Sequence, residues 1–451
     1  MLAKVHSGAV YGVDAYPVEI EVNTGGGDPQ TVIVGLPDVA VKESKDRVNT
    51  AIRNSGFEMP KDRLTINLAP ADIKKEGPIF DLPIALGVLA TMGDVPAEAL
   101  DRFALVGELA LSGEVRRVRG VLPIAIAMRD RCRPAIIVPR DNAAEAAVVE
   151  GIDVYPVRCL REAADLAAGR LAAAPCRTDA ARAFASDLAH EEDFADVKGQ
   201  EHAKRAIEVA VAGGHNLLMV GPPGTGKTML AKRVPSILPP MSLEEALETT
   251  RIHSIAGVLP PRQALVARRP FRAPHHTVSD AGLLGGGAHP MPGEVSLAHR
   301  GVLFMDELPE FHRNVLEVLR QPLEEGAVTI SRAAASLTFP CEFMLVAAMN
   351  PCPCGYYGDA KRNCRCTPVQ IQNYRNKISG PLLDRIDMHI EVESVPAERI
   401  AAPAGEEPSA DVRARCEAAR AAQRERYRGA GVRCNAQLDA RTLDTHCPAE
   451  P

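Results

Sequence analysis

The segment GPPGTGKT, Gly221 to Thr228, constrains this chain most, because it directly follows an apolar run, Asn-Leu-Leu-Met-Val. Such a run is typical of a buried strand, and the residues that follow Lys227 are typical of a helix. Glycines let the backbone approach a ligand closely, and a helix that begins at Lys227 directs its positive end at an anion. The pattern therefore predicts a phosphate-binding loop rather than a chance glycine-rich turn.

The loop also carries two side chains with specific chemistry. We expect Lys227 to reach the β- and γ-phosphates of a nucleotide and Thr228 to ligate Mg²⁺. The residues expected to hold the nucleotide are Gly221, Pro222, Pro223, Gly224, Thr225, Gly226, Lys227 and Thr228.

Two further apolar runs end in polar residues of the kind that such a loop needs. Gly-Val-Leu-Phe-Met leads into Asp306 and Glu307, and Phe-Met-Leu-Val-Ala-Ala-Met leads into Asn350. Asp306 is expected to hold the Mg²⁺, Glu307 to act as general base on the attacking water, and Asn350 to orient that water. The alternatives are a buried strand that ends in solvated acids, and an ordinary turn at Asn350-Pro.

Four of the eleven cysteines lie close together, as Cys352-Pro-Cys354 and Cys364-Arg-Cys366. Two pairs of thiols on short loops can close tetrahedrally around Zn²⁺, although this spacing is tighter than the usual zinc knuckle. We expect a structural zinc site; plain reduced thiols and redox switching are the alternatives. The other cysteines are dispersed, which does not resemble a disulfide framework.

The length of 451 residues indicates two or three domains. We predict an α/β domain over residues 1–170, an Ala-rich linker over 171–192, a second α/β domain over 193–395, and a helical segment over 396–451. Acidic residues exceed basic ones, 58 to 52, so any contact with nucleic acid must be local. Without a signal peptide or a long apolar run, the chain is expected to be cytoplasmic and to have no membrane partner.

The segments GPPGTGKT, VLFMDE, AAMNP and SGPLLDRID together resemble an AAA+ ATPase. The phrase FRAPHHTVSDAGLLGGGAHPMPGEVSLAHRGVLFMDE, over residues 271–307, narrows the resemblance to the magnesium-chelatase-like ComM/YifB family, and the similarity extends from Met1 to the end. The resemblance implies an ATP- and Mg²⁺-dependent homo-hexamer in which Arg385 reaches the nucleotide of the neighbouring subunit. Without the family, Arg385 would be read as a surface ion pair with Asp384 or Asp387.

The resemblance also implies two segments for contact with DNA. Residues 271–292 would form an insert that faces the pore of the ring, and Gly326 to Phe339 would form a hairpin with Arg332 near its tip. Arg268, Arg269 and Arg272 precede His275 and His276, and beside a mobile loop they could hold phosphates without reading bases. The alternative is that these charged loops are only solvated.

The two ends of the chain have their own resemblances. LTINLAPADIKKEGPIFDLPIALGVL, residues 64–89, resembles the Lon-protease-like fold that is shared with a ribosomal protein. Lon proteases carry a nucleophilic Ser after Gly-Pro, whereas Gly77-Pro78 is followed here by Ile79, which disfavours peptidase activity. At the other end, the C-terminal helical lid is expected to be incomplete, which puts coupled hydrolysis in question.

Three functions remain open on the sequence. The first is an ATP-driven DNA translocase or helicase that promotes branch migration in natural transformation and recombination. The second is a motor subunit that drives metal insertion by a chelatase. The third is a non-proteolytic regulatory scaffold.

Overall fold

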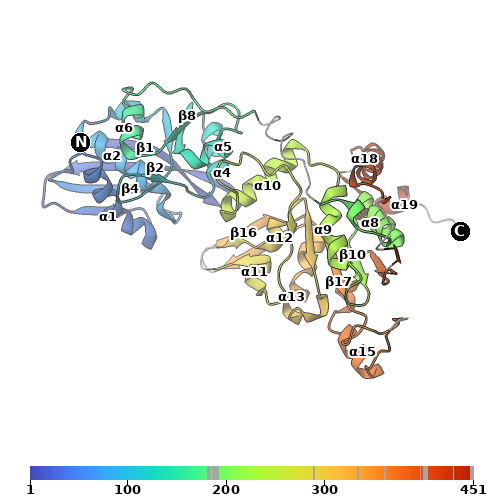
Figure 1. The fold of residues 1–451 in the computed structure, drawn as a ribbon. Coiled ribbons are helices and arrows are strands. Elements are labelled where there is room, and N and C mark those ends of the chain that lie inside the picture. The colour runs from blue at the N-terminus through green and yellow to red at the C-terminus, as the bar shows by residue number, and fades with distance from the viewer. Residues whose placement is uncertain are drawn as a thin grey trace. The chain divides into compact units, whose positions relative to one another are not determined.

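The computed structural model describes residues 1–179, 184, 192–287, 290–332, 335–359, 362–396, 398–399, 405–429 and 431–446. The chain divides into two compact units, one of residues 1–186 with 246–266 and the other of 187–245 with 267–451 (Figure 1). Most of the predicted linker after residue 179, the side chain of Arg332 and the last five residues lie outside the described residues.

The first unit is built on a seven-stranded sheet with the strand order β3-β4-β2-β1-β5-β8-β9. β1 pairs with β2, and β2 with β4, in antiparallel fashion, whereas the remaining pairs are parallel. The elements are β1 Leu2–Tyr11, β2 Asp14–Gly25, β3 Thr31–Val34, α1 Val39–Asn54, β4 Arg63–Ala69, α2 Asp81–Met92, α3 Ala97–Leu100, β5 Phe103–Leu105, β6 Glu108–Leu109, β7 Val115–Arg116, α4 Val121–Asp130, β8 Ala135–Pro139, α5 Ala143–Ala146, β9 Asp153–Val157 and α6 Leu160–Ala167.

Helices cover both faces of this sheet. On one face α2 packs so closely that a Cβ at Gly87 would lie 2.6 Å from Cγ2 of Val22. On the other face α4 approaches β1, where a Cβ at Gly8 would lie 2.7 Å from Cγ2 of Ile124. Because neighbouring strand residues face opposite sides, the central strands contribute apolar side chains to two buried layers.

The run from Phe103 to Leu111 forms two strands with a break between them, because β5 ends at Leu105 and β6 covers only Glu108–Leu109. The backbone of Gly107 between them bonds to the entrance of α2: its N–H donates to Ile79 O, and its carbonyl accepts from Leu82 N. These bonds replace the ladder bonds that a continuous strand would make.

A buried carboxylate ties α1 to α2 in the same unit. Asp81 is fully buried and accepts hydrogen bonds from the Ser44 hydroxyl, from the Arg47 guanidinium (Nε at 2.8 Å) and from Leu109 N at 3.2 Å. A charge taken out of water is tolerated only when it is paired and hydrogen-bonded in this way.

The second unit contains a five-stranded parallel sheet with the order β11-β14-β17-β10-β18. Its elements are α8 Glu201–Gly213, β10 Leu217–Val220, α9 Lys227–Ile237, α10 Leu243–Ala256, β11 Phe271–Arg272, α11 Asp280–Leu284, β12 Gly285–Gly286, β13 Met291–Pro292, α12 Glu294–Leu297, β14 Val302–Met305, α13 Arg313–Val318, α14 Arg320–Glu325, β15 Ala327–Arg332, β16 Ala335–Pro340, β17 Met344–Met349, α15 Pro368–Arg375, α16 Gly380–Leu383, β18 Met388–Glu391, α18 Ser409–Arg426 and α19 Ala440–His446, of which α10 continues into the first unit. The strands β10, β14 and β17 are apolar throughout because parallel strands are covered on both faces. The mixed α/β class is therefore confirmed.

Residues 246–266, which include most of α10, belong to the first unit. The carbonyl of Ser254 accepts a hydrogen bond from Gly120 N at 3.1 Å, and that of Leu259 accepts one from Arg117 Nη2 at 2.5 Å. These residues lie inside the second predicted domain, and no local pattern in the sequence predicts that they pack with the first.

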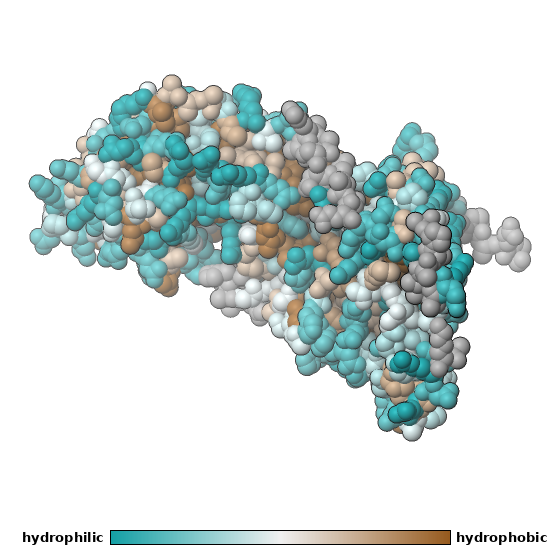
Figure 2. Space-filling view, viewed as in Figure 1, coloured by the Kyte–Doolittle hydropathy of each residue, from teal (hydrophilic) through white to brown (hydrophobic). Residues whose placement is uncertain are grey.

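The apolar side chains lie mainly in the two cores. On the face drawn in Figure 2, hydrophilic residues cover most of the surface, with small hydrophobic groups between them. Every helix in the part of the chain that the structure describes is too short or too polar to pass through a bilayer.

The Asp81 network yields a stability prediction. Asp81→Asn keeps the side-chain volume but turns an amide donor toward the donors of Arg47 and Leu109, so we expect the free energy of unfolding to fall by about 2–4 kcal/mol. The matched control is Glu43→Gln, because Glu43 lies 3.8 Å from the same guanidinium but is 66% exposed. The Glu43→Gln substitution should lower the free energy of unfolding by less than about 1 kcal/mol. Urea denaturation measures both, and equal losses would refute the role of Asp81.

Candidate functional site

The polar residues that follow three strands of the second unit meet at one edge of its sheet. β10 leads into Gly221–Thr228, β14 into Asp306 and Glu307, and β17 into Asn350. β10 and β14 both flank β17 in parallel register, so the carboxyl ends of all three strands point the same way. This edge is where open α/β sheets bind their ligands.

The loop Gly221–Thr228 has the backbone of an anion cradle. Gly224 and Gly226 have φ angles of +79° and +89°, which side chains rarely allow. A Cβ at Gly221 would lie 2.2 Å from the carbonyl oxygen of Val392, so only glycine fits there. α9 begins at Lys227, and its free N–H groups and dipole therefore favour an anion in the loop.

Lys227 is almost fully buried, and its ammonium faces the loop itself. Nζ donates to the carbonyl of Gly221 at 2.7 Å, to that of Pro222 at 2.9 Å and to Oδ1 of Asn350 at 3.4 Å. Burial lowers the pKa of Lys227, although the nearby carboxylates of residues 306 and 307 raise it. The structure thus brings the lysine and the asparagine together, as the sequence analysis expects.

Thr228 and Asp306 are in direct contact. The threonine Oγ1 donates to Oδ2 of the aspartate at 2.6 Å. A hydroxyl and a carboxylate are the hard oxygen donors that Mg²⁺ prefers, so this pair fits the predicted metal ligands.

Glu307 follows in a left-handed conformation, with a φ of +53°. Its N–H donates to Oδ1 of Asp306 at 3.0 Å, and its side chain is 57% exposed. Nδ1 of His276 lies 3.9 Å from Oε2 of Glu307, and the rings of His275 and His276 have centroids 4.0 Å apart. The sequence analysis read these histidines only as part of the insert; nothing in their spacing indicates a neighbour 31 residues later.

The loop Gly221–Thr228 also contacts Gln200, which no pattern in the sequence indicates. The side-chain amide of Gln200 donates to the carbonyl of Thr225 at 3.1 Å and to that of Glu393 at 2.6 Å. Gln200 precedes α8 in a left-handed conformation, with a φ of +61°. It therefore ties the loop Gly221–Thr228 to the chain that leaves β18.

Arg385 lies apart from the residues above. Its guanidinium is 44% exposed and pairs with Glu324, with Nε 2.8 Å from Oε1. The alternative of a surface ion pair is therefore confirmed in kind, but the partner is Glu324 rather than Asp384 or Asp387. Asp387 instead accepts a hydrogen bond from Asn216 N at 3.0 Å and lies 3.2 Å from Nδ1 of His215.

Two of the three arginines expected to offer phosphate contacts are engaged inside the unit. Arg269 is largely covered, with 17% of its side chain exposed, and donates to the carbonyl of Pro239 and to that of Arg300, both at 2.6 Å. Arg272 makes two hydrogen bonds to Glu294, at 2.6 and 2.7 Å. Their donors anchor the start of the insert to its surroundings, and the predicted contact of these two side chains with phosphates stays a prediction.

The expected hairpin is present. β15 and β16 pair in antiparallel fashion from Ala327 and Pro340 to Arg332 and Ala335. Hydroxyl groups face each other across the strands, Thr329 with Thr338 at 2.9 Å. The side chain of Arg332 lies outside the described residues, so its predicted contact with DNA stays a prediction.

The four clustered cysteines converge on one point. The Sγ atoms of Cys352, Cys354 and Cys364 lie 3.4, 3.7 and 3.6 Å apart, and all four, with Cys366, lie within 4.8 Å of one another. Four thiolates bound to one zinc ion at about 2.3 Å would lie about 3.8 Å from each other. The cluster therefore has the dimensions of a tetrahedral metal centre.

The backbone supports the ionised form of one of these thiols. Hydrogen bonds from the N–H groups of Tyr356 and Arg365 lower the pKa of Cys354 to about 6. The thiolate is the form that ligates metals. The described cysteines are all free thiols, as expected for a chain without a disulfide framework.

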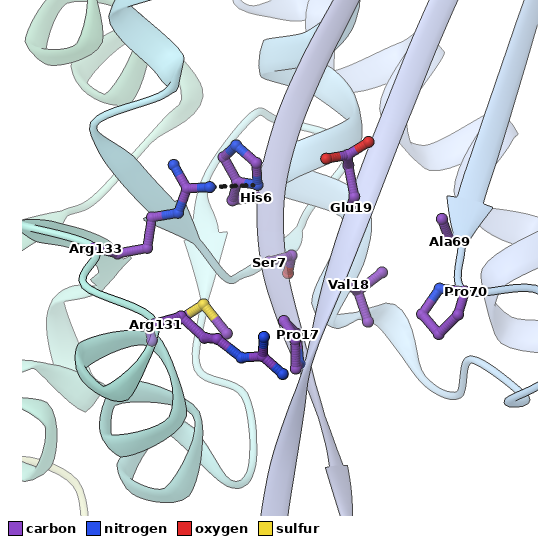
Figure 3. Close-up of a pocket in the computed structure, with 10 residues that line it drawn as sticks. His6, Ser7, Pro17, Val18, Glu19, Ala69, Pro70, Arg131 and Arg133 are labelled. Carbon is purple, nitrogen blue, oxygen red and sulfur yellow. Dashed lines mark hydrogen bonds between the residues drawn. The ribbon is translucent and has the colours of Figure 1, made fainter.

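The first unit has a pocket of its own, of about 530 Å³ (Figure 3). His6, Arg131 and Arg133 line it, and Arg133 contacts Nδ1 of His6 at 3.4 Å. Burial and the Arg133 charge lower the pKa of His6. Ile79, which follows Gly77-Pro78, is buried in the core.

Comparison with known proteins agrees with this geometry. The family model described as "Magnesium chelatase, subunit ChlI" matches residues 193–400, "Subunit ChlI of Mg-chelatase" matches 20–142, and "Magnesium chelatase, subunit ChlI C-terminal" matches 406–451.

Individual relatives cover nearly the whole chain. The YifB protein of Salmonella typhimurium is 45% identical over 450 residues, 99% of this chain and 86% of that protein. The competence protein ComM of Haemophilus influenzae is 45% identical over 453 residues, again 99% and 86%. Lon protease 2 of Bacillus subtilis is 30% identical over 125 residues, 28% of this chain and 22% of that protein.

Proposed function

This chain belongs to the ComM/YifB family of magnesium-chelatase-like AAA+ proteins, and we propose that it is an ATP-hydrolysing ring motor that acts on DNA. The observation that carries the ATPase part is the convergence of Lys227, Thr228, Asp306 and Asn350 at one sheet edge. The family implies the use of ATP and Mg²⁺, and the residues at this edge have the chemistry for both.

Each residue of the edge has a distinct role in the proposed reaction. The N–H groups of the loop and Lys227 bind the β- and γ-phosphates, and Thr228 and Asp306 hold Mg²⁺, which neutralises charge on those phosphates. Glu307 accepts a proton from the attacking water, and Asn350 orients that water. His276 lies close enough to Glu307 to influence where its carboxylate points.

The charge that develops on the γ-phosphate needs a further cation. We propose that Arg385 supplies it from the neighbouring protomer of a homo-hexamer. Its exposed guanidinium contacts Glu324 rather than the phosphate-binding loop of its own chain, which supports a role between subunits. On assembly, Arg385 would exchange the carboxylate of Glu324 for the phosphate.

The DNA part of the proposal rests on the relationship to ComM, whose name describes a competence protein. By this analogy the chain would be a cytoplasmic translocase or helicase that promotes branch migration during recombination. The β15–β16 hairpin is the segment that we expect to contact the DNA backbone, since Arg269 and Arg272 donate to acceptors of their own unit.

A second candidate follows from the family models themselves, which are named after a magnesium chelatase subunit. In this alternative the same ATPase would drive metal insertion through a partner. The third candidate is a regulatory scaffold, in which the first unit is a Lon-like, non-proteolytic binding domain. Such a scaffold would need neither DNA nor a metal to insert. DNA dependence of ATP turnover separates the first candidate from the other two.

We further propose that the cysteine cluster holds Zn²⁺. All four positions of a tetrahedral ion would be filled by protein thiolates, so the ion would be structural rather than catalytic.

The two key residues of the ATPase should separate binding from turnover. Lys227→Ala removes a charged phosphate ligand and should weaken ATP binding by at least about 100-fold. Glu307→Gln should bind ATP with normal affinity but lower kcat by about 100-fold or more. Calorimetry and phosphate release measure these effects, and Lys232→Ala, an exposed lysine on the same helix, is the control. Undiminished binding by Lys227→Ala would contradict the phosphate assignment.

DNA should stimulate the enzyme. We expect single-stranded or forked DNA to raise the kcat for ATP, and the Glu307→Gln variant to bind the same DNA without turnover. Steady-state ATPase assays over a panel of DNA structures, paired with anisotropy binding, provide the measurement. The translocase proposal fails if an active ATPase neither binds nor responds to any DNA.

The zinc proposal predicts a defined stoichiometry. Elemental analysis of protein purified under reducing conditions should find about one zinc per chain, and Cys364→Ser should lose it and melt at a lower temperature. Cys132→Ser is the control, because Cys132 is an exposed free thiol outside the cluster. A native protein without metal would eliminate the site.

A further inference from the structure

The loop that carries the four cysteines continues directly from the nucleotide site. Asn350, whose amide accepts from Lys227 Nζ, is followed by Pro351 and then by Cys352, which is fully buried. Between the end of β17 and the start of α15, the described residues form no helix or strand. The loop therefore has no regular backbone ladder to hold its shape, and it depends on contacts made by its side chains and turns.

Gly355 places this loop directly against the phosphate-binding loop. A Cβ at Gly355 would lie 2.7 Å from both Cγ and Cδ of Pro223, and 3.9 Å from Cγ of Asn350. The N–H of Gly355 donates to the carbonyl of Cys352 at 3.0 Å, which closes a turn that contains Cys352 and Cys354. The thiol loop thus touches both the nucleotide loop and the residue proposed to orient water.

The other end of the cysteine loop leads into α15, which contacts the residues next to Asn350. Cys366 precedes α15, and Nε of Arg375 on that helix donates to the carbonyl of Pro351 at 3.3 Å. Tyr374, also on α15, is buried.

We propose that occupancy of the four-thiolate site by Zn²⁺ controls the nucleotide site. With the ion bound, the turn from Cys352 to Gly355 is cross-linked to Cys364 and Cys366 and forms a fixed wall against Pro223 and Asn350. Without the ion, this turn loses its main constraint and gains conformational freedom, so the wall no longer supports the phosphate-binding loop. This inference rests on the ATP and zinc binding proposed above.

Two glycines of the loop allow a matched test. Gly355 and Gly358 have nearly equal positive φ angles, +85° and +81°, so alanine strains the backbone similarly at either position. A Cβ at Gly358 would meet nothing within 4 Å, whereas one at Gly355 would overlap Pro223. Gly355→Ala therefore disturbs the contact with the nucleotide loop, and Gly358→Ala controls for strain.

The experiment measures zinc content and ATP affinity of the full chain in reducing buffer. We expect Gly355→Ala to retain zinc but to bind ATP about tenfold more weakly than Gly358→Ala. In the wild type, removal of zinc by a zinc-selective chelator, with Mg²⁺ kept in excess, should weaken ATP binding, and added Zn²⁺ should restore it.

The outcomes separate this inference from its premises. Equal ATP affinity of the two glycine variants, or full affinity of zinc-free wild type, overturns the control of the nucleotide site while leaving the ATPase proposal standing. A wild type that holds zinc but binds no ATP overturns the proposed function itself. A wild type that binds ATP but takes up no Zn²⁺ overturns the metal site and the inference with it.

Discussion

The parallel alignment of β10, β14 and β17 is the constraint on which the second unit depends. Because the three strands point the same way, residues 221–228, 306–307 and 350 emerge at one edge although they are far apart in the chain. The bonds from Lys227 to Asn350 and from Thr228 to Asp306 then fix the spacing between the strand ends. The same apolar residues that bury the strands therefore also position the chemistry.

This dependence explains which parts of the site could be predicted. A strand that runs straight into a polar residue is a local pattern, so the sequence suffices for Lys227, Asp306 and Asn350. The cysteine pairs are likewise local, and tertiary structure adds only that their sulfur atoms converge. Mixed α/β architecture follows from the same alternation of apolar runs and helical stretches.

Contacts between distant segments escaped prediction for the opposite reason. His276 beside Glu307, Gly355 against Pro223 and Gln200 on the phosphate-binding loop each join residues whose own neighbours give no signal. The surroundings of the arginines could not be predicted for the same reason. Arg269 and Arg272 have the composition of a phosphate-binding patch, but acceptors elsewhere in the unit already occupy their donors. Charge alone does not show whether a guanidinium is free.

The passage of residues 246–266 into the first unit affects how this protein can be dissected. The chain changes units after residues 186, 245 and 266, so no single cut separates one unit from the other. Ile252, Ile255 and Leu259, at 1%, 5% and 1% exposure, would lose their cover if residues 187–451 were expressed alone. Such a fragment would expose an apolar patch, and its aggregation could be mistaken for an inability to bind nucleotide. A separately produced ATPase piece is therefore a poor substitute for the intact polypeptide.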